Sequence, residues 1–211
     1  MDTSGHARRP LIGILAVQGG VTEHQRTLDC LGVASRLVRR ASHLENLDGL
    51  ILPGGESTTM SKLLELGGLL DPLMRKINDG TPTFGTCAGM ILLASDVRGT
   101  RPDAHCLSAL DITVQRNAFG RQVDSFETDL DFDGIDDPVH AVFIRAPWVE
   151  SVGPDTAVLA RVPQGPHAGA VVAVRSGNGA GHVLATSFHP EVTDDSRVHD
   201  YFVSMVMESM V

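Results

Sequence analysis

The sequence has few of the features that mark disulfide-rich or membrane-spanning proteins. Its 211 residues include three cysteines, one tryptophan and one tyrosine. The three cysteines, Cys30, Cys87 and Cys106, cannot all pair with one another, so free thiols in a reducing compartment are the default expectation. The apolar run at 11–17 follows Arg8 and Arg9, but it is too short to span a bilayer and lacks the small-residue cleavage pattern of a signal peptide. We therefore expect a soluble, cytoplasmic protein.

Positive charge is also scarce. Lys and Arg total 17 against 26 Asp and Glu, which gives a net charge of −9 at pH 7. Because an acidic chain without a basic cluster binds a phosphate backbone poorly, we expect no nucleic-acid partner. Seven acidic residues gather in one tract, but their spacing fails the EF-hand pattern, so a solvated loop without metal is expected. These are Asp124, Glu127, Asp129, Asp131, Asp133, Asp136 and Asp137.

The length and the 42% hydrophobic content suit one globular domain, which we place at 11–211 after a flexible lead-in at 1–10. The first half alternates apolar runs of strand length with stretches of helical periodicity. The expected strands are 11–17, 33–38, 49–52 and 81–86, and the expected helices are 21–31, 59–77 with a break at 67–68, and 88–94. Strands buried on both faces with helices between them indicate an α/β protein with a doubly wound, mostly parallel sheet.

Beyond residue 100 the expected strands are short and separated by Gly, Pro and Asp turns, which predicts an antiparallel extension of the sheet. They are 112–114, 123–127, 141–144, 157–162, 170–174 and 182–187. A helix at 195–210 closes the chain, with Ser196 or the preceding aspartates available as its cap. Cys30, inside a helical stretch, is expected in the core, whereas His24 and His199 suggest no chemistry.

The sharpest local motif is Gly85-Thr86-Cys87-Ala88-Gly89, between an expected strand and an expected helix. It has the form of a nucleophile elbow with cysteine in place of serine. Glycines allow a tight turn that lifts the nucleophile above the sheet, and the amino end of the helix favours a thiolate. In isolation, a buried structural cysteine beside a glycine turn is an equally good interpretation.

A second motif, Ser187-Phe188-His189-Pro190-Glu191, follows an expected strand. A cysteine nucleophile needs a base, and the base needs a third group that fixes its tautomer. In an extended segment, residues two apart point to the same side, so His189 and Glu191 can lie together. A lone histidine more often has a structural role, and only its neighbours favour catalysis here.

A third motif, Leu52-Pro53-Gly54-Gly55-Glu56-Ser57, also follows an expected strand. Paired glycines let backbone N–H groups approach a developing oxyanion, and Gly55 and Ala88 are the candidate donors. A phosphate-binding loop lacks its G-K-[ST] here, and a plain β-turn is the other alternative. All three motifs come at carboxyl ends of expected strands, where open α/β sheets bind their ligands.

The chain resembles the class I (triad) glutamine amidotransferases, and within them the glutaminase subunits of pyridoxal 5'-phosphate synthase, the PdxT type. Besides the three motifs, three further segments carry this resemblance over nearly the whole chain. They are Gly13-Ile14-Leu15-Ala16-Val17-Gln18-Gly19, Gln115-Arg116-Asn117-Ala118-Phe119-Gly120-Arg121-Gln122 and Phe143-Ile144-Arg145-Ala146-Pro147. The second is the most specific to this type.

The resemblance implies a flavodoxin-like fold and a glutaminase whose Cys87 forms a thioester with glutamine and releases ammonia. His189 would move the proton and Glu191 would hold the imidazole. Substrate contacts would come from Gly54, Gly55, Glu56, Arg116, Ile144 and Arg145, with Gly55 and Ala88 facing the oxyanion. No cofactor is implied. The implied partner is a synthase subunit of the PdxS type, in a large hetero-oligomer that makes pyridoxal 5'-phosphate.

Three alternatives remain at this point. A glutaminase could serve another synthase, such as one that makes imidazole glycerol phosphate, although the segment at 115–122 disfavours this. A different cysteine hydrolase could use the same sheet. A catalytically silent subunit could activate a partner, but the intact set of Cys87, His189 and Glu191 argues against that role.

Overall fold

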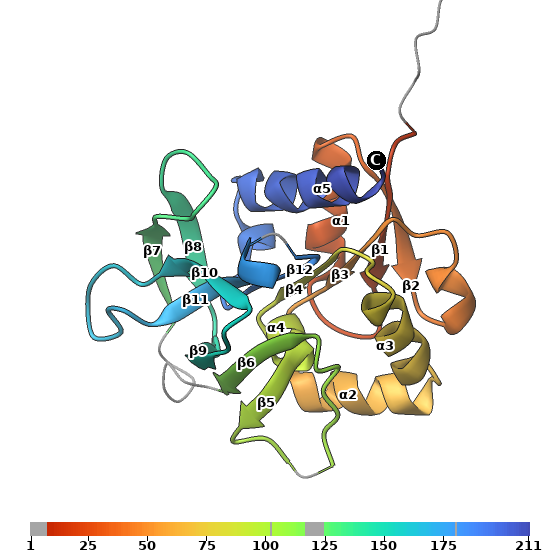
Figure 1. The fold of residues 1–211 in the computed structure, drawn as a ribbon, viewed down its shortest axis with the longest axis horizontal. Helices are drawn as coiled ribbons and strands as arrows, with labels where there is room; N and C mark the ends of the chain where they lie inside the picture. Colours follow the sequence, from red (N-terminus) through yellow and green to blue (C-terminus); the bar gives the residue numbers. More distant parts are fainter. Residues whose placement is uncertain (1–7, 102, 117–124, 180) are drawn as a thin grey trace, which may run out of the picture.

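The computed structural model describes residues 8–101, 103–116, 125–179 and 181–211, and Figure 1 shows how their elements are arranged. Most of the expected lead-in (1–7) and most of the segment at 115–122 (117–122) lie outside the described residues. The helices are α1 (Val21–Cys30), α2 (Ser57–Leu66), α3 (Leu70–Asn78), α4 (Ala88–Leu93) and α5 (Arg197–Ser209). Single 3-10 turns occur at η1 (Ala41–Leu44), η2 (Gly177–Gly179) and η3 (Pro190–Val192).

The main sheet confirms the doubly wound plan. Its strands are β1 (Leu11–Leu15), β2 (Ala34–Val38), β3 (Gly49–Leu52), β4 (Thr83–Thr86), β5 (Ala94–Arg98), β6 (Leu110–Gln115), β9 (Trp148–Val152), β10 (Thr156–Arg161), β11 (Val171–Ser176) and β12 (Val183–Thr186). Their order is β2-β1-β3-β4-β12-β11-β9-β6-β5, and β10 pairs with β11. The five strands from β2 to β12 are parallel, whereas β11 is antiparallel to both β12 and β9. A small separate sheet pairs β7 (Phe126–Leu130) with β8 (Val139–Phe143).

Helices cover both faces of the parallel strands (Figure 1). On β1, Ile12 and Ile14 belong to the core cluster that includes α1 and α5 residues, while Leu15 belongs to the cluster with α2, α3 and α4. This alternation follows from the two-residue period of a strand. Each fully buried side chain of this size contributes about 1.5–3 kcal/mol to folding, so the two clusters fix which way every strand faces.

The position of β12 differs from the expectation. The strand was expected among antiparallel strands of the second half, but it lies in the centre and pairs in parallel with β4, so that Val183 lies opposite Thr83. All four residues of β12 are buried. A continuous apolar run indicates burial on both faces but says nothing about the direction of the neighbouring strand, so the sequence could not fix this pairing.

Two strands, β5 and β9, were not predicted. Both are rich in polar residues: Ser95 and Asp96 on β5 are exposed, as are Glu150 and Ser151 on β9. The start of β5 was assigned instead to the end of the preceding helix. Strands with this composition give little hydrophobic alternation, and their pairing at and near one edge of the sheet comes from tertiary context.

Two local predictions were wrong. Cys30 is exposed rather than in the core, because the buried face of α1 carries His24, Thr27 and Leu28 at helical spacing and Cys30 is off that stripe. The acidic tract is not a simple loop, because Glu127 and Asp129 lie on β7 with exposed side chains that alternate with less exposed ones.

The expected cap of α5 is provided by an aspartate, since Asp195 Oδ1 accepts from the Arg197 backbone N–H at 3.1 Å.

Candidate active site

Four loops meet at one edge of the parallel strands. They follow the carboxyl ends of β1, β3, β4 and β12, and they carry Gln18, Gly54, Cys87 and His189 respectively. Adjacent parallel strands bring their carboxyl ends to the same edge of a sheet. The three motifs that are far apart in the sequence are therefore brought together, as expected.

Cys87 occupies a strained turn between β4 and α4. Its φ of 49° lies in the left-handed region, which a residue with a side chain adopts only when its surroundings enforce it. The tight packing beneath it explains Gly89, because a Cβ there would lie 2.0 Å from the Leu52 carbonyl oxygen. The thiol side chain is almost completely buried, with 6% of Cys87 exposed. This is the geometry expected of a nucleophile elbow.

His189 and Glu191 form a close pair. The Nδ1 atom of His189 lies 2.8 Å from Oε1 of Glu191, whose side chain is only 1% exposed. The backbone between them was expected to be extended, but Pro190–Val192 is a 3-10 turn. The turn brings the carboxylate back under the imidazole, and Pro190 suits its first position because proline needs no backbone N–H there. The pairing was therefore predicted correctly, but from the wrong backbone geometry.

The electrostatics of His189 link it to Cys87 as well. Burial alone would lower its pKa, but a hydrogen bond with Cys87 and another with Glu191 outweigh this effect and raise the pKa of His189 to about 10. Because Nδ1 is on the Glu191 side, the remaining ring nitrogen, Nε2, is the atom available to the thiol. Burial raises the pKa of Glu191, yet its interactions with His24 and His189 lower it overall, so this carboxyl stays ionised.

Gly54 sits against both side chains of the pair. A Cβ at this position would lie 2.3 Å from Cε1 of His189 and 3.4 Å from Cβ of Cys87, so only glycine fits. Its backbone N–H donates to Oγ1 of Thr86 at 3.0 Å, and its carbonyl accepts from the Gly20 N–H at 3.1 Å. The loop after β3 thus lies against both Cys87 and the imidazole of His189.

The neighbouring residue Gly55 is held by Gln18. Oε1 of Gln18 accepts from the Glu56 backbone N–H at 2.8 Å, and a Cβ on Gly55 would come within 2.6 Å of the same oxygen. Gln18 was noted in the sequence only as part of the family-like segment at 13–19. Ala88, the other expected oxyanion donor, is the first residue of α4 and is buried beside Cys87.

The Glu56 carboxylate caps α2 and is fully engaged. It accepts from the backbone N–H groups of Thr58 and Thr59, and its Oε1 lies 2.9 Å from the Arg116 guanidinium. Burial would raise the pKa of Glu56, but these hydrogen bonds and Arg116 lower it to about 2. Arg116 also donates to Oγ1 of Thr58 at 3.0 Å. The structure therefore joins Glu56 to Arg116, although they are 60 residues apart in the chain.

Ile144 and Arg145 follow β8 and are both exposed. Their strand is anchored beside His189, because the His189 backbone N–H donates to the Val142 carbonyl oxygen at 3.0 Å. Arg145 has a φ of 47°, so this turn is also held in an uncommon conformation. The two expected substrate-binding residues are thus next to the edge at which His189 lies.

Two buried histidines that the sequence left without a role lie behind Glu191. His24 on α1 and His199 on α5 are both 0% exposed, and His24 Nδ1 is 2.8 Å from His199 Nε2. His24 Nε2 is 3.6 Å from Oε1 of Glu191. Burial is the main cause that lowers the pKa of His24, and burial with the proximity of His24 lowers the pKa of His199 to about 3. Both shifts favour the neutral form of these imidazoles.

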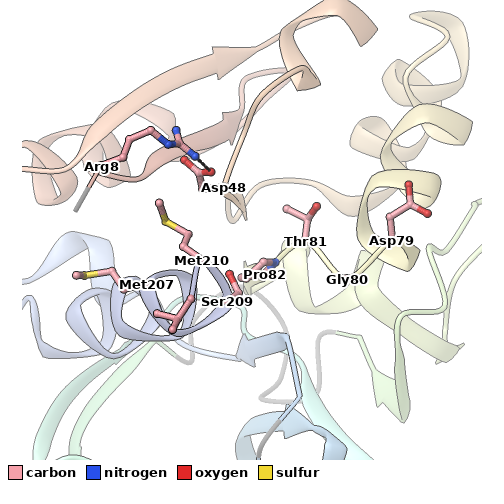
Figure 2. A pocket seen from close by; sticks show the side chains of 10 residues that line it. Arg8, Asp48, Asp79, Gly80, Thr81, Pro82, Met207, Ser209 and Met210 are labelled. Atoms are coloured by element: carbon pink, nitrogen blue, oxygen red, sulfur yellow. Dashed lines mark hydrogen bonds and ion pairs between the residues drawn. The ribbon is translucent and has the colours of Figure 1, made fainter. Parts of the chain in front are cut away.

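A pocket of about 560 Å³ lies at the opposite edge of the sheet. Figure 2 shows Met207 of α5 and Met210, just after that helix, on one side of it and the Thr81-Pro82 segment on another, with Arg8 paired to Asp48. Thr81 and Pro82 precede β4, whereas Cys87 follows it. This pocket is therefore separated from the candidate active site by the length of the strands.

Within the described residues, no cluster of three or more histidine, cysteine or acidic side chains has a geometry that could hold a metal ion. The helices in that part of the chain are too short or too polar to cross a bilayer.

Comparisons with known proteins agree with one another. A family model described as the SNO glutamine amidotransferase family matches residues 14–208. The "Pyridoxal 5'-phosphate synthase subunit PdxT" of Nocardia farcinica is 64% identical over 199 residues, covering 94% of this chain and 86% of the relative. The protein of the same name from Corynebacterium jeikeium is 62% identical over 198 residues, covering 94% and 97%.

Solved structures have the same fold. One described as "Crystal structure of glutamine amidotransferase" is 44% identical, with a TM-score of 0.83 over 92% of this chain and 98% of the other. A putative GMP synthase component from Thermoplasma acidophilum has a TM-score of 0.67 over 97% of each chain, at 20% identity. The sheet and its helices thus have the flavodoxin-like arrangement of class I glutamine amidotransferases.

Proposed function

The chain belongs to the SNO glutamine amidotransferase family, and from this premise we propose that Cys87, His189 and Glu191 are its catalytic triad. The chain is a glutaminase, and the ammonia that it releases supplies pyridoxal 5'-phosphate synthesis. The observation that carries the triad proposal is the position of His189, which interacts with both Cys87 and the buried carboxylate of Glu191. This is the arrangement that nucleophilic catalysis by a thiol requires.

The first half of the reaction forms a thioester. With the proton on His189, the Cys87 thiolate attacks the side-chain carbonyl carbon of glutamine, and a tetrahedral oxyanion forms. As the C–N bond breaks, Nε2 of His189 gives its proton to the leaving nitrogen, which departs as ammonia. Glu191 stabilises the imidazolium before the transfer and keeps its Nδ1–H in place throughout.

The second half restores the enzyme. Neutral His189 takes a proton from a water molecule, and the resulting hydroxide equivalent attacks the thioester carbonyl carbon. The C–S bond breaks, glutamate leaves, and the sulfur is again a thiolate beside a protonated imidazole. The net reaction is glutamine plus water to glutamate plus ammonia.

We assign the oxyanion donors to the backbone N–H groups of Gly55 and Ala88. A donor of this kind typically contributes about 3 kcal/mol to transition-state stabilisation. Gly54 supports the same role indirectly, because its contact with His189 holds the loop against the reacting atoms. Glu56 is expected to contact glutamine through its backbone, since its carboxylate already caps α2.

Arg116, Ile144 and Arg145 are proposed to hold the amino-acid head group. A guanidinium that pairs with the substrate carboxylate would orient the amide toward sulfur. Arg145 is the stronger candidate for this ion pair, because the Arg116 guanidinium is already occupied by Glu56 and Thr58. Arg116 would then act chiefly by holding Glu56 and the start of α2 in place.

The chain acts with a synthase partner, as its PdxT relatives do. Released ammonia is mostly protonated in water at neutral pH and would lose its nucleophilicity, so direct transfer between the two proteins is favoured. We propose that the two assemble as a large hetero-oligomer in the cytoplasm. The free thiols of Cys30, Cys87 and Cys106 support a reducing compartment.

An ammonia-release assay on glutamine tests the function, with and without a pyridoxal 5'-phosphate synthase subunit of the PdxS type. We expect that subunit to stimulate turnover strongly, and we expect Cys87→Ala to abolish it. Cys30→Ala is the matched control, because Cys30 is exposed on α1 and its replacement should leave the rate unchanged. Turnover that persists in Cys87→Ala would overturn the triad, and fast hydrolysis of unrelated amides without a partner would point to a different cysteine hydrolase.

A further inference from the structure

A continuous row of buried polar side chains extends behind the proposed triad, and this inference rests on that triad. From the nucleophile inward it runs through His189 and Glu191 to His24 on α1 and then His199 on α5. Both inner histidines are fully buried. Burying two imidazoles in one core is unfavourable unless their polar atoms are paired, so the row calls for a physical explanation.

The hydrogen-bond partners decide which nitrogen of His24 carries the proton. If Nδ1 carried it, the bare lone pair of Nε2 would face the Glu191 carboxylate, and His199 would be left with a buried N–H at Nδ1 that has no partner among the described residues. If Nε2 carries the proton, it donates to Oγ1 of Thr86 at 3.2 Å and lies 3.6 Å from Oε1 of Glu191, and Nδ1 accepts from the Nε2–H of His199. The second tautomer leaves only an unpaired lone pair on His199, which costs less than an unpaired donor.

The same nitrogen of His24 also reaches the loop over the active site. Its Nε2 lies 3.2 Å from Oγ1 of Thr86, and that oxygen accepts the Gly54 backbone N–H at 3.0 Å. Thr86 immediately precedes Cys87. One imidazole is therefore in contact with the triad carboxylate and with the hydroxyl that anchors the proposed oxyanion loop.

We propose that His24 is a positioning residue for glutamine hydrolysis, whose Nε2–H donates to Thr86 beneath the Gly54 loop and, 3.6 Å from Oε1 of Glu191, stabilises that carboxylate beside His189. His199 has the lesser role of setting the His24 tautomer from α5. The charged and titratable groups that influence His24 are Glu191, His189 and Glu23, together with His199. His24 touches no reacting atom, so its effect passes through Glu191 and Thr86.

Two amide substitutions distinguish the role of Nδ1 of His24 from the role of its Nε2. In His24→Gln the terminal amide N–H reaches the place of Nε2 and retains a donor toward Glu191. In His24→Asn the shorter amide reaches only the place of Nδ1, so the contact with His199 is retained and the donor toward Glu191 is lost. His182→Gln is the control, because His182 is partly buried and bonds the Ile77 carbonyl oxygen at 3.0 Å, far from the triad.

Steady-state kinetics of glutamine hydrolysis in the complex with the synthase subunit give the readout. We expect His24→Asn to lower kcat about 10- to 100-fold, the scale known for losing a group that orients a metal-bound histidine or carboxylate. KM for glutamine should stay near the wild-type value, because the head-group contacts are elsewhere. His24→Gln should recover most of kcat, and His182→Gln should match the wild type.

Equal kcat values for His24→Gln and His24→Asn would overturn the proposal, as would a change confined to KM. A second measurement does not depend on the variants folding: ¹⁵N nuclear magnetic resonance of the wild-type chain should find the proton of His24 on Nε2. A proton on Nδ1 would refute the positioning role. Failure of the triad itself would be recognised separately, because Cys87→Ala would then retain turnover whatever the His24 variants do.

Discussion

The Nδ1 atom of His189 and Oε1 of Glu191 are 2.8 Å apart, and only Pro190 separates the two residues in the chain. The 3-10 turn that begins at Pro190 folds the carboxylate back under the imidazole. The proposed base and the group proposed to orient it are therefore parts of one short segment that directly follows β12. Cys87, in contrast, is far from His189 in the chain and lies beside its imidazole only because β4 pairs with β12.

Replacing Glu191 by glutamine should leave the shape of this unit intact and remove its charge. The imidazolium of His189 then loses its buried partner, and one orientation of the amide presents an N–H to Nδ1. We expect kcat for glutamine hydrolysis to fall by about 10⁴-fold, as in other triads that lose this carboxylate. The matched control is Glu127→Gln, because Glu127 pairs with His140 on the exposed surface and its loss should not change kcat.

The protonation of His189 gives a second prediction. Its pKa is raised to about 10 by Cys87 and Glu191 against the opposing effect of burial, so Cys87→Ala and Glu191→Gln should each lower it. A histidine titration followed by nuclear magnetic resonance measures this shift directly. An unchanged pKa in Cys87→Ala would mean that the sulfur and the imidazole do not interact.

The same shift makes the stability depend on pH with a definite sign. A folded-state pKa above the ordinary value of 6.5 means that the folded chain binds the His189 proton more tightly than the unfolded chain. This stabilisation is fully present below about pH 6.5 and is lost as pH rises toward about 10. Urea unfolding across this range should therefore show a decline that His189→Gln reduces.

Gly54→Ala tests the contact between the proposed oxyanion loop and His189, the proposed base. The new Cβ would fall 2.3 Å from Cε1 of His189, so either the imidazole or the loop must move. A displacement of about 1 Å at a reacting group can cost about 100-fold in rate, and we expect a loss of that order in kcat. Gly32→Asn is the control, because nothing described lies within 4 Å of that position and asparagine tolerates its φ of +69°.

Arg145→Ala is expected to raise KM for glutamine by about 10-fold or more, since a charge-assisted hydrogen bond to a carboxylate contributes about 1.5–3 kcal/mol. The fall in kcat should be smaller, because the triad is untouched. Arg161→Ala removes an exposed arginine that donates to the Gly169 carbonyl oxygen and serves as the control. If KM for glutamine is unchanged in Arg145→Ala, the contact with the substrate carboxylate must be assigned to Arg116 instead.

Much of the fold and of the site could be predicted from the sequence. β3 lies at 49–52 as expected, and the break at Gly67-Gly68 separates α2 from α3. These features depend on local apolar periodicity and on glycine, which the sequence displays directly. The three motifs met at one edge because each follows the carboxyl end of a parallel strand, a rule that needs no knowledge of side-chain packing.

What the sequence could not reveal depends on distant partners. The central place of β12 depends on which strand it meets, and the polar strands β5 and β9 are held by their neighbours. His24 and His199 are 175 residues apart, and each in isolation looks like an ordinary histidine on a helix. Only the packing of α1 and α5 on one face of the sheet makes them a pair beside Glu191.

The pairing of Val183 with Thr83 has a consequence for the timing of activity in the life of the chain. β4 and Cys87 are synthesised before β12, whose place in the sheet is between β4 and β11. A chain that ends before β12 lacks His189 and Glu191, the proposed base and the group proposed to orient it. On the proposed triad, such an incomplete chain would hydrolyse no glutamine.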